Sequence, residues 1–66
     1  MKRLTWCDLP NGERYEVLDG RFVQGPRHSF YVRFSKNGVT ISDRVYTTEV
    51  EARKNFERLV EEKANA

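Results

Sequence analysis

The stretch that decides the fold is residues 30–46, FYVRFSKNGVTISDRVY, in a chain of 66 residues. Apolar and polar residues alternate on both sides of Asn37-Gly38, and this alternation is typical of β-strands. Asn-Gly is the preferred two-residue hairpin turn, because both of its positions tolerate a positive φ. Residues 30–36 and 39–46 are therefore predicted to form an antiparallel hairpin.

The turn also predicts the register of this hairpin. Counting outward from the turn brings the apolar faces of the two strands together, with the pairs Lys36–Val39, Phe34–Ile41 and Phe30–Val45. Asp43 does not fit this pattern, because the register places it on the apolar face opposite Val32. A β-bulge near Ser42 and Asp43 would relieve the conflict.

The same register leaves the second face of the sheet open, which antiparallel sheets permit. It pairs Tyr31 with Arg44 and Arg33 with Ser42, and it adds Tyr46. Arginine bonds phosphates and guanine edges, and tyrosine stacks on bases. We therefore predict a nucleic-acid-binding face formed by Tyr31, Arg33, Ser42, Arg44 and Tyr46, with Arg21, Arg27, His28 and Lys36 at its rim.

A helix is predicted over residues 48–64. Thr48 is a suitable N-cap, and Glu51 three residues later completes a capping box. Apolar residues then recur at spacings of three and four as far as Lys63, so most of them share one face. We expect this face to pack on the apolar side of the sheet.

The first half of the chain gives a weaker signal. Residues 15–18 and 21–24 flank Asp19-Gly20, which predicts a second hairpin. Residues 1–13 form either an edge strand or an irregular segment. The predicted fold is α+β, a single domain with an antiparallel meander of three or four strands and one C-terminal helix packed on one face. Its predicted core is Val17, Phe22, Phe30, Val32, Phe34, Ile41, Val45, Phe56, Leu59 and Val60.

Composition excludes several classes of protein. One cysteine allows no internal disulfide, and one cysteine with one histidine is too few for a structural zinc site. No apolar run reaches the ~20 residues of a membrane span, and a lone thiol without a signal peptide indicates the cytoplasm. Cys7 and His28 lie in unrelated segments. We expect no catalytic residues, no cofactor and no metal, and hence no enzyme.

The chain is weakly basic overall, with a formal net charge of +2. Residues 1–48 hold eight Lys/Arg and five Asp/Glu, which leaves +3, whereas residues 49–66 hold four and five, which leaves −1. The positive excess therefore lies on the predicted sheet, and it favours an acidic partner.

Residues 29–52, SFYVRFSKNGVTISDRVYTTEVEA, resemble the three-stranded-sheet-plus-helix domains at the amino-terminal end of phage and transposon integrases. They are also similar to the ethylene-response-factor domain of plants. The shared pattern is an aromatic strand, a turn, a second strand and a helix start, here Tyr46-Thr47-Thr48 followed by Ala52. The resemblance implies DNA contacts from Tyr31, Arg33, Ser42 and Arg44.

Two kinds of function stay open on these grounds. One is a small protein that binds DNA or RNA through the open face. The other is a protein-interaction module, because tyrosine and arginine are also favoured in protein–protein hot spots. A phage- or plasmid-type inhibitor of a host protein is one form of such a module, and a homodimer paired through sheet edges or open faces is another.

Overall fold

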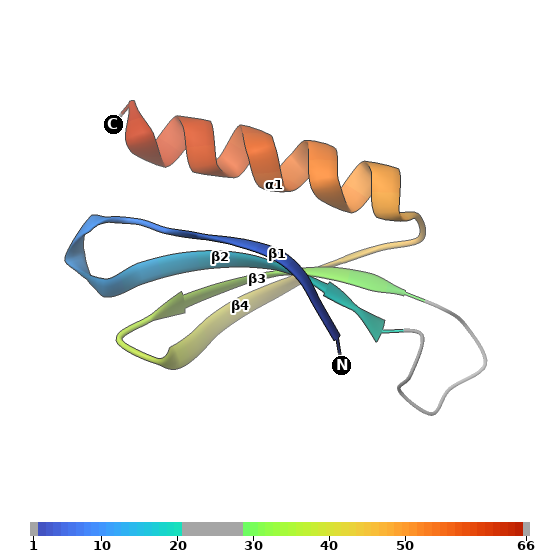
Figure 1. Cartoon of the computed structure of the whole chain (residues 1–66), viewed down its shortest axis with the longest axis horizontal. Coiled ribbons are helices and arrows are strands. Elements are labelled where there is room, and N and C mark those ends of the chain that lie inside the picture. The colour runs from blue at the N-terminus through green and yellow to red at the C-terminus, as the bar shows by residue number, and fades with distance from the viewer. Residues whose placement is uncertain (1, 21–28, 66) are drawn as a thin grey trace.

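The computed structural model describes residues 2–20 and 29–65 and shows an antiparallel sheet with one helix on one face (Figure 1). The strands are β1 (Lys2–Asp8), β2 (Glu13–Asp19), β3 (Phe30–Lys36) and β4 (Val39–Tyr46). They lie side by side in the order β1-β2-β3-β4. A short 3-10 turn, η1 (Pro10–Gly12), joins β1 to β2, and helix α1 (Glu49–Ala64) follows β4. The predicted α+β meander is confirmed, and it has four strands.

The N-terminal segment forms an edge strand, which decides between the two alternatives for residues 1–13. β1 pairs with β2, and β2 pairs on its other side with β3, so Val17 lies between Thr5 and Val32. The predicted hairpin of residues 15–18 with 21–24 is therefore wrong for residues 15–18, whose partners are β1 and β3. Residues 21–24 lie outside the described part of the chain.

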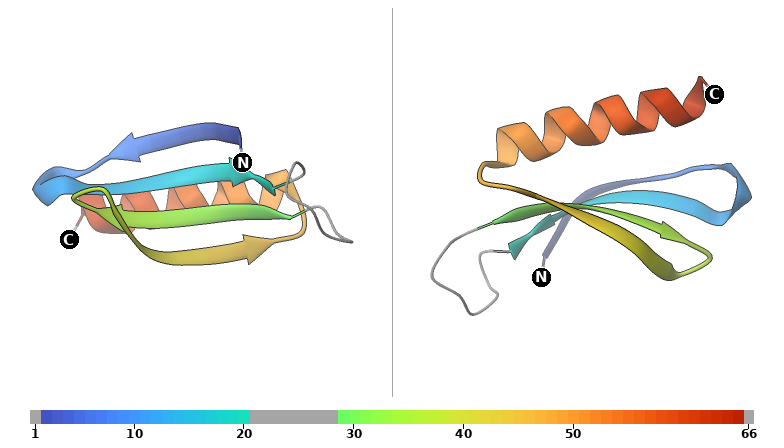
Figure 2. Two further views of the ribbon diagram at one scale, coloured as in Figure 1. Left: turned by 90° about the horizontal axis from the view of Figure 1, so that it is seen from below. Right: turned by 180° about the vertical axis from the view of Figure 1, so that it is seen from behind.

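Helix α1 begins where the capping box predicts. The Thr48 side chain accepts a hydrogen bond of 3.2 Å from the Glu51 backbone N–H. Ala52, Phe56 and Leu59 are the buried residues of the helix. The helix lies over β2 and β3, and β1 and β4 extend beyond it on either side (Figure 2, left). The core therefore lies between α1 and the two central strands.

The β3–β4 hairpin departs from its predicted register beyond the turn. Asn37 and Gly38 have the predicted positive φ values of 53° and 82°, and the pairs Lys36–Val39 and Ser35–Thr40 are as predicted. The next pair is Phe34–Ser42, so Ile41 is an extra residue in β4. A β-bulge at Ile41 thus places every later residue of β4 on the face opposite to the predicted one.

The bulge also corrects the predicted core. Ile41 and Val45 are 59% and 61% exposed, so their assignment to the core is wrong. Phe34 and Val60 are only partly buried, and Phe22 lies outside the described residues. The other predicted core residues, Val17, Phe30, Val32, Phe56 and Leu59, are buried, and the structure adds Tyr15, Leu18 and Ala52.

Both Asn-Gly turns lie at the same end of the sheet. Asn11 and Gly12 have φ values of 67° and 76°, so this turn also needs residues that tolerate the left-handed region. The Asn37 backbone N–H donates a 2.8 Å hydrogen bond to the Gly12 carbonyl. A Cβ atom on Gly12 would overlap the Asn37 side chain. The two turns therefore hold one another in place.

Candidate functional site

The open face of the sheet, on the side away from α1, consists of three rows of side chains. The strand registers define these rows from β1 to β4. They are Arg3, Leu18, Tyr31 and Val45; Trp6, Glu16, Arg33 and Asp43; and Asp8, Arg14, Ser35 and Thr40. Arginines and carboxylates on neighbouring strands lie directly opposite one another in the second and third rows.

Arg33 and Asp43 form the best-aligned ion pair of this face. Arg33 donates two hydrogen bonds to the Asp43 carboxylate, at 2.9 Å from Nε and 3.1 Å from the second guanidinium nitrogen. Two parallel hydrogen bonds are the strongest arrangement of an arginine with a carboxylate. The hydrogen bond to Asp43 raises the pKa of the Arg33 guanidinium. Arg33 therefore stays positively charged throughout the physiological range, with Asp43 as its counterion.

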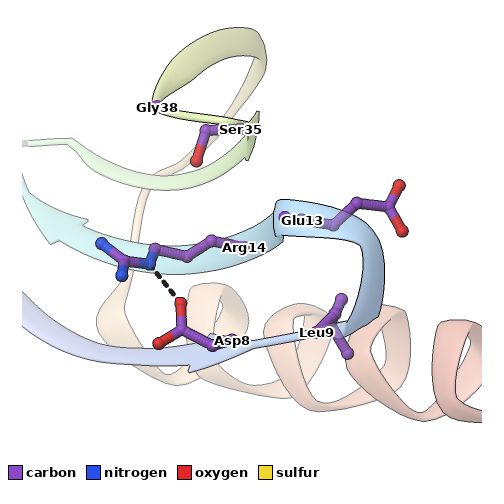
Figure 3. A pocket seen from close by; sticks show the side chains of 7 residues that line it. Asp8, Leu9, Glu13, Arg14, Ser35 and Gly38 are labelled. Carbon is purple, nitrogen blue, oxygen red and sulfur yellow. Dashed lines mark hydrogen bonds and ion pairs between the residues drawn. The ribbon is translucent and has the colours of Figure 1, made fainter.

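The other two arginines of the open face are also paired. Arg14 donates a 2.5 Å hydrogen bond from Nε to Asp8, and this bond raises the pKa of Arg14. Figure 3 shows these two side chains turned toward each other beside a pocket of about 280 Å³. Arg3 lies 3.6 Å from the Glu16 carboxylate. Among the described residues, three positive and three negative charges thus balance on this face.

Aromatic residues flank these charges. Trp6 on β1 is 49% exposed, and the Arg3 guanidinium carbon lies 4.0 Å from the centroid of its ring. Tyr31 on β3 packs against Gly20: a Cβ atom there would lie 2.5 Å from Tyr31 Cε2 and 2.6 Å from the Ser29 carbonyl oxygen. Gly20 therefore permits the close approach that positions the Tyr31 ring.

The predicted nucleic-acid face is divided between the two sides of the sheet. Tyr31 and Arg33 lie on the open face, but they face Val45 and Asp43 instead of Arg44 and Ser42. The bulge at Ile41 places Ser42, Arg44 and Tyr46 on the helix side, opposite Phe34, Val32 and Phe30. The predicted grouping of the five residues on one face is therefore wrong.

Of the predicted rim, Lys36 lies in the described part of the chain. Lys36 is exposed at the turn end of β3, opposite Glu13 and Val39. Arg21, Arg27 and His28 lie outside the described residues.

Sequence reasoning missed the β1 and β2 contribution to the open face, namely Arg3, Trp6, Asp8, Arg14 and Glu16. Asn11-Gly12 marks a turn between these strands, and it could have predicted the hairpin. It could not have predicted the register, because four residues separate β1 from β2 and β1 has its own register shift between Arg3 and Thr5. Asp43 does not fit the apolar face on which the predicted register places it, and this misfit was the sequence signal for its ion pair with Arg33.

Reactive groups are few in the described part of the chain. Cys7 is partly buried against the core, and its Sγ lies 3.7 Å from the Asp8 carbonyl oxygen. No group of three or more His, Cys, Asp or Glu side chains there could hold a metal ion. None of the helical segments described in residues 2–20 and 29–65 is long and apolar enough to cross a membrane.

Comparisons with protein-family models, curated proteins and solved structures found no match to this chain. The resemblance to integrase amino-terminal domains and to the ethylene-response-factor domain therefore stays a prediction.

Proposed function

We propose that this chain is a small, non-enzymatic module that binds a partner protein through the open face of its sheet. The observation that carries this proposal is the pairing of Arg3, Arg14 and Arg33 with carboxylates of the same face. A surface with balanced charges gives little attraction for phosphates, whose binding depends on unpaired cations that displace counterions.

The same face has the composition of a protein-binding hot spot. Tryptophan, tyrosine and arginine dominate the binding energy of protein interfaces when they lie near the centre of a contact. Trp6 is exposed with Arg3 stacked on it, and Tyr31 is fixed against Gly20. Because ion pairs already orient the arginines, little side-chain freedom remains to be lost on binding.

A set of charge variants tests this proposal against DNA binding. The triple variant Asp8→Asn, Glu16→Gln and Asp43→Asn removes the three counterions and leaves three arginines unpaired on the face. We expect amide-shift titration with a short DNA duplex at low salt to give open-face shifts for the variant and none for the wild type. Shifts of Arg33 and Tyr31 in the wild type that disappear as salt rises would overturn the proposal.

Binding to a protein partner gives the complementary test. Affinity capture from a lysate of the source organism would use the wild type, Trp6→Ala and, as an exposed control away from the open-face centre, Val39→Ala. We expect the wild type and Val39→Ala to capture the same partner. Trp6→Ala should bind that partner at least about tenfold more weakly, which corresponds to ~1.4 kcal/mol. Equal capture by all three proteins would show that the open face is not the binding surface.

Nucleic-acid binding is a second candidate, now on a different surface. Ser42, Arg44 and Tyr46 lie together on the helix side of β4. Within the described residues, Arg44 forms no ion pair or side-chain hydrogen bond, so its charge is available for a phosphate. The same DNA titration tests this candidate. DNA binding at this surface requires salt-sensitive amide shifts at Ser42, Arg44 and Tyr46 in the wild type. These shifts should be absent when the same titration is made with Arg44→Ala.

A further inference from the structure

β4 is an edge strand that exposes several apolar side chains. Among the described residues, five large hydrophobic side chains are exposed, and three of them, Val39, Ile41 and Val45, lie on β4. An edge strand presents unpaired backbone N–H and C=O groups, and proteins usually protect such edges with charges or bulges. Figure 2 (left) shows that α1 lies over β2 and β3 and leaves the β4 edge uncovered.

The opposite edge, β1, is better protected. Its seven residues include Lys2, Arg3 and Asp8, and a register shift between Arg3 and Thr5 interrupts the strand near its middle. The bulge of β4 lies nearer the turn, at Ile41, and leaves residues 42–46 in a regular run. That run is long enough for another strand to pair with it.

Charge disfavours two of the registers in which two β4 strands could pair. In a two-fold antiparallel pair, residues opposite each other share a face, and like charges directly opposite each other are destabilising. A pair centred on Asp43 would oppose two carboxylates, and one centred on Arg44 would oppose two guanidinium groups. A pair centred on Val45 opposes Val45 with Val45, Arg44 with Tyr46, and Asp43 with Thr47.

We propose that two copies of this chain pair antiparallel through β4, with the two-fold axis at Val45. The four strands of each copy then form one continuous sheet, with both helices on the same face. Arg44, unpaired among the described residues of one copy, lies opposite Tyr46 of the second copy. The pair uses the strand edge and not the open face, so it goes beyond the proposed function and does not depend on it.

The oligomeric state and a matched pair of variants test this inference. Sedimentation equilibrium of the full chain should give twice the 7.8 kDa chain mass as concentration rises. Val45→Lys places two ammonium groups across the two-fold axis, and we expect at least about a tenfold weaker self-association. Val39→Lys, an equally exposed valine on the turn side of the bulge, should associate like the wild type. Circular dichroism checks that both variants are folded.

Cysteine cross-linking tests the register itself. In a Cys7→Ser background, Val45→Cys places two thiols at the axis, where opposite Cα atoms lie ~5.5 Å apart, within disulfide range. We expect oxidation to give a covalent dimer for Val45→Cys and monomer for Val39→Cys.

Three results would overturn the proposal. The first is a wild-type chain that stays monomeric up to millimolar concentration. The second is equal weakening by Val39→Lys and Val45→Lys, or equal cross-linking of the two cysteine variants. The third is growth beyond two copies, which indicates head-to-tail pairing of β1 with β4.

Discussion

Val32 and Val45 occupy neighbouring strands but opposite environments. Val32 is 2% exposed between Val17 and Arg44, whereas Val45 lies on the open face beside Tyr31. Replacing valine by threonine keeps the branched shape and exchanges one methyl group for a hydroxyl. The cost of that hydroxyl therefore depends on whether the site is in contact with water.

We predict that Val32→Thr lowers the free energy of unfolding by about 1–3 kcal/mol, because it buries a hydroxyl in an apolar core. The same change at Val45 should alter it by less than about 0.5 kcal/mol, since exposed sites of this kind are tolerant. Urea unfolding of the two variants, at concentrations low enough to keep the chain monomeric, measures the difference. Equal losses would mean that Val45 is part of the core.

At the scale of elements, helix α1 depends on its first residues. The Thr48 hydroxyl accepts from the Glu51 backbone N–H, which has no partner within the helix. Thr48→Ala should lower the free energy of unfolding by about 1 kcal/mol. Thr47→Ala, one residue earlier and also exposed, removes a hydroxyl that does not cap the helix, and it should cost less than about 0.5 kcal/mol. Urea unfolding followed by circular dichroism compares them, and equal losses would contradict the capping role.

The elements differ in how far the sequence predicts them. Helix α1 and the Asn37-Gly38 turn follow from local signals, a capping residue and two residues at positive φ, and both are confirmed. The bulge at Ile41 does not follow from the turn, because the turn permits both a regular and a bulged continuation. The misfit of Asp43 did predict a bulge, but near Ser42 and Asp43 and not at Ile41. Only the side chains on both faces decide between the two continuations, and here the bulged register lets Asp43 meet Arg33.

The prediction of the candidate site from sequence is limited in the same way. Strand side chains alternate with a period of two, so one inserted residue moves Ser42, Arg44 and Tyr46 together to the other face. The sequence therefore predicts correctly that Ser42, Arg44 and Tyr46 share one face of the sheet. It does not predict that Tyr31 and Arg33 lie on the opposite face.

At the scale of the whole molecule, a chain of this length buries a small core and gains from association. If two copies pair through β4, mass action stabilises the folded state as concentration rises. We predict that the thermal midpoint of the wild type increases by roughly 5 °C over a hundredfold increase in concentration. Val45→Lys should show a smaller increase over the same range, as measured by scanning calorimetry. A constant midpoint in the wild type would contradict self-association.

The strand order β1-β2-β3-β4 also bears on how the chain reaches its fold. Each strand pairs with its neighbour in sequence, so the sheet forms by closing short loops, and short loops lose little chain entropy on closure. Hairpins form in ~1–10 μs, and β3 with β4 has the shortest connection of the sheet. We therefore expect this hairpin to be a nucleus of folding, with φ-values that are high around Asn37-Gly38 and low in β1. Because α1 packs on β2 and β3, the helix can dock only after these two strands have paired.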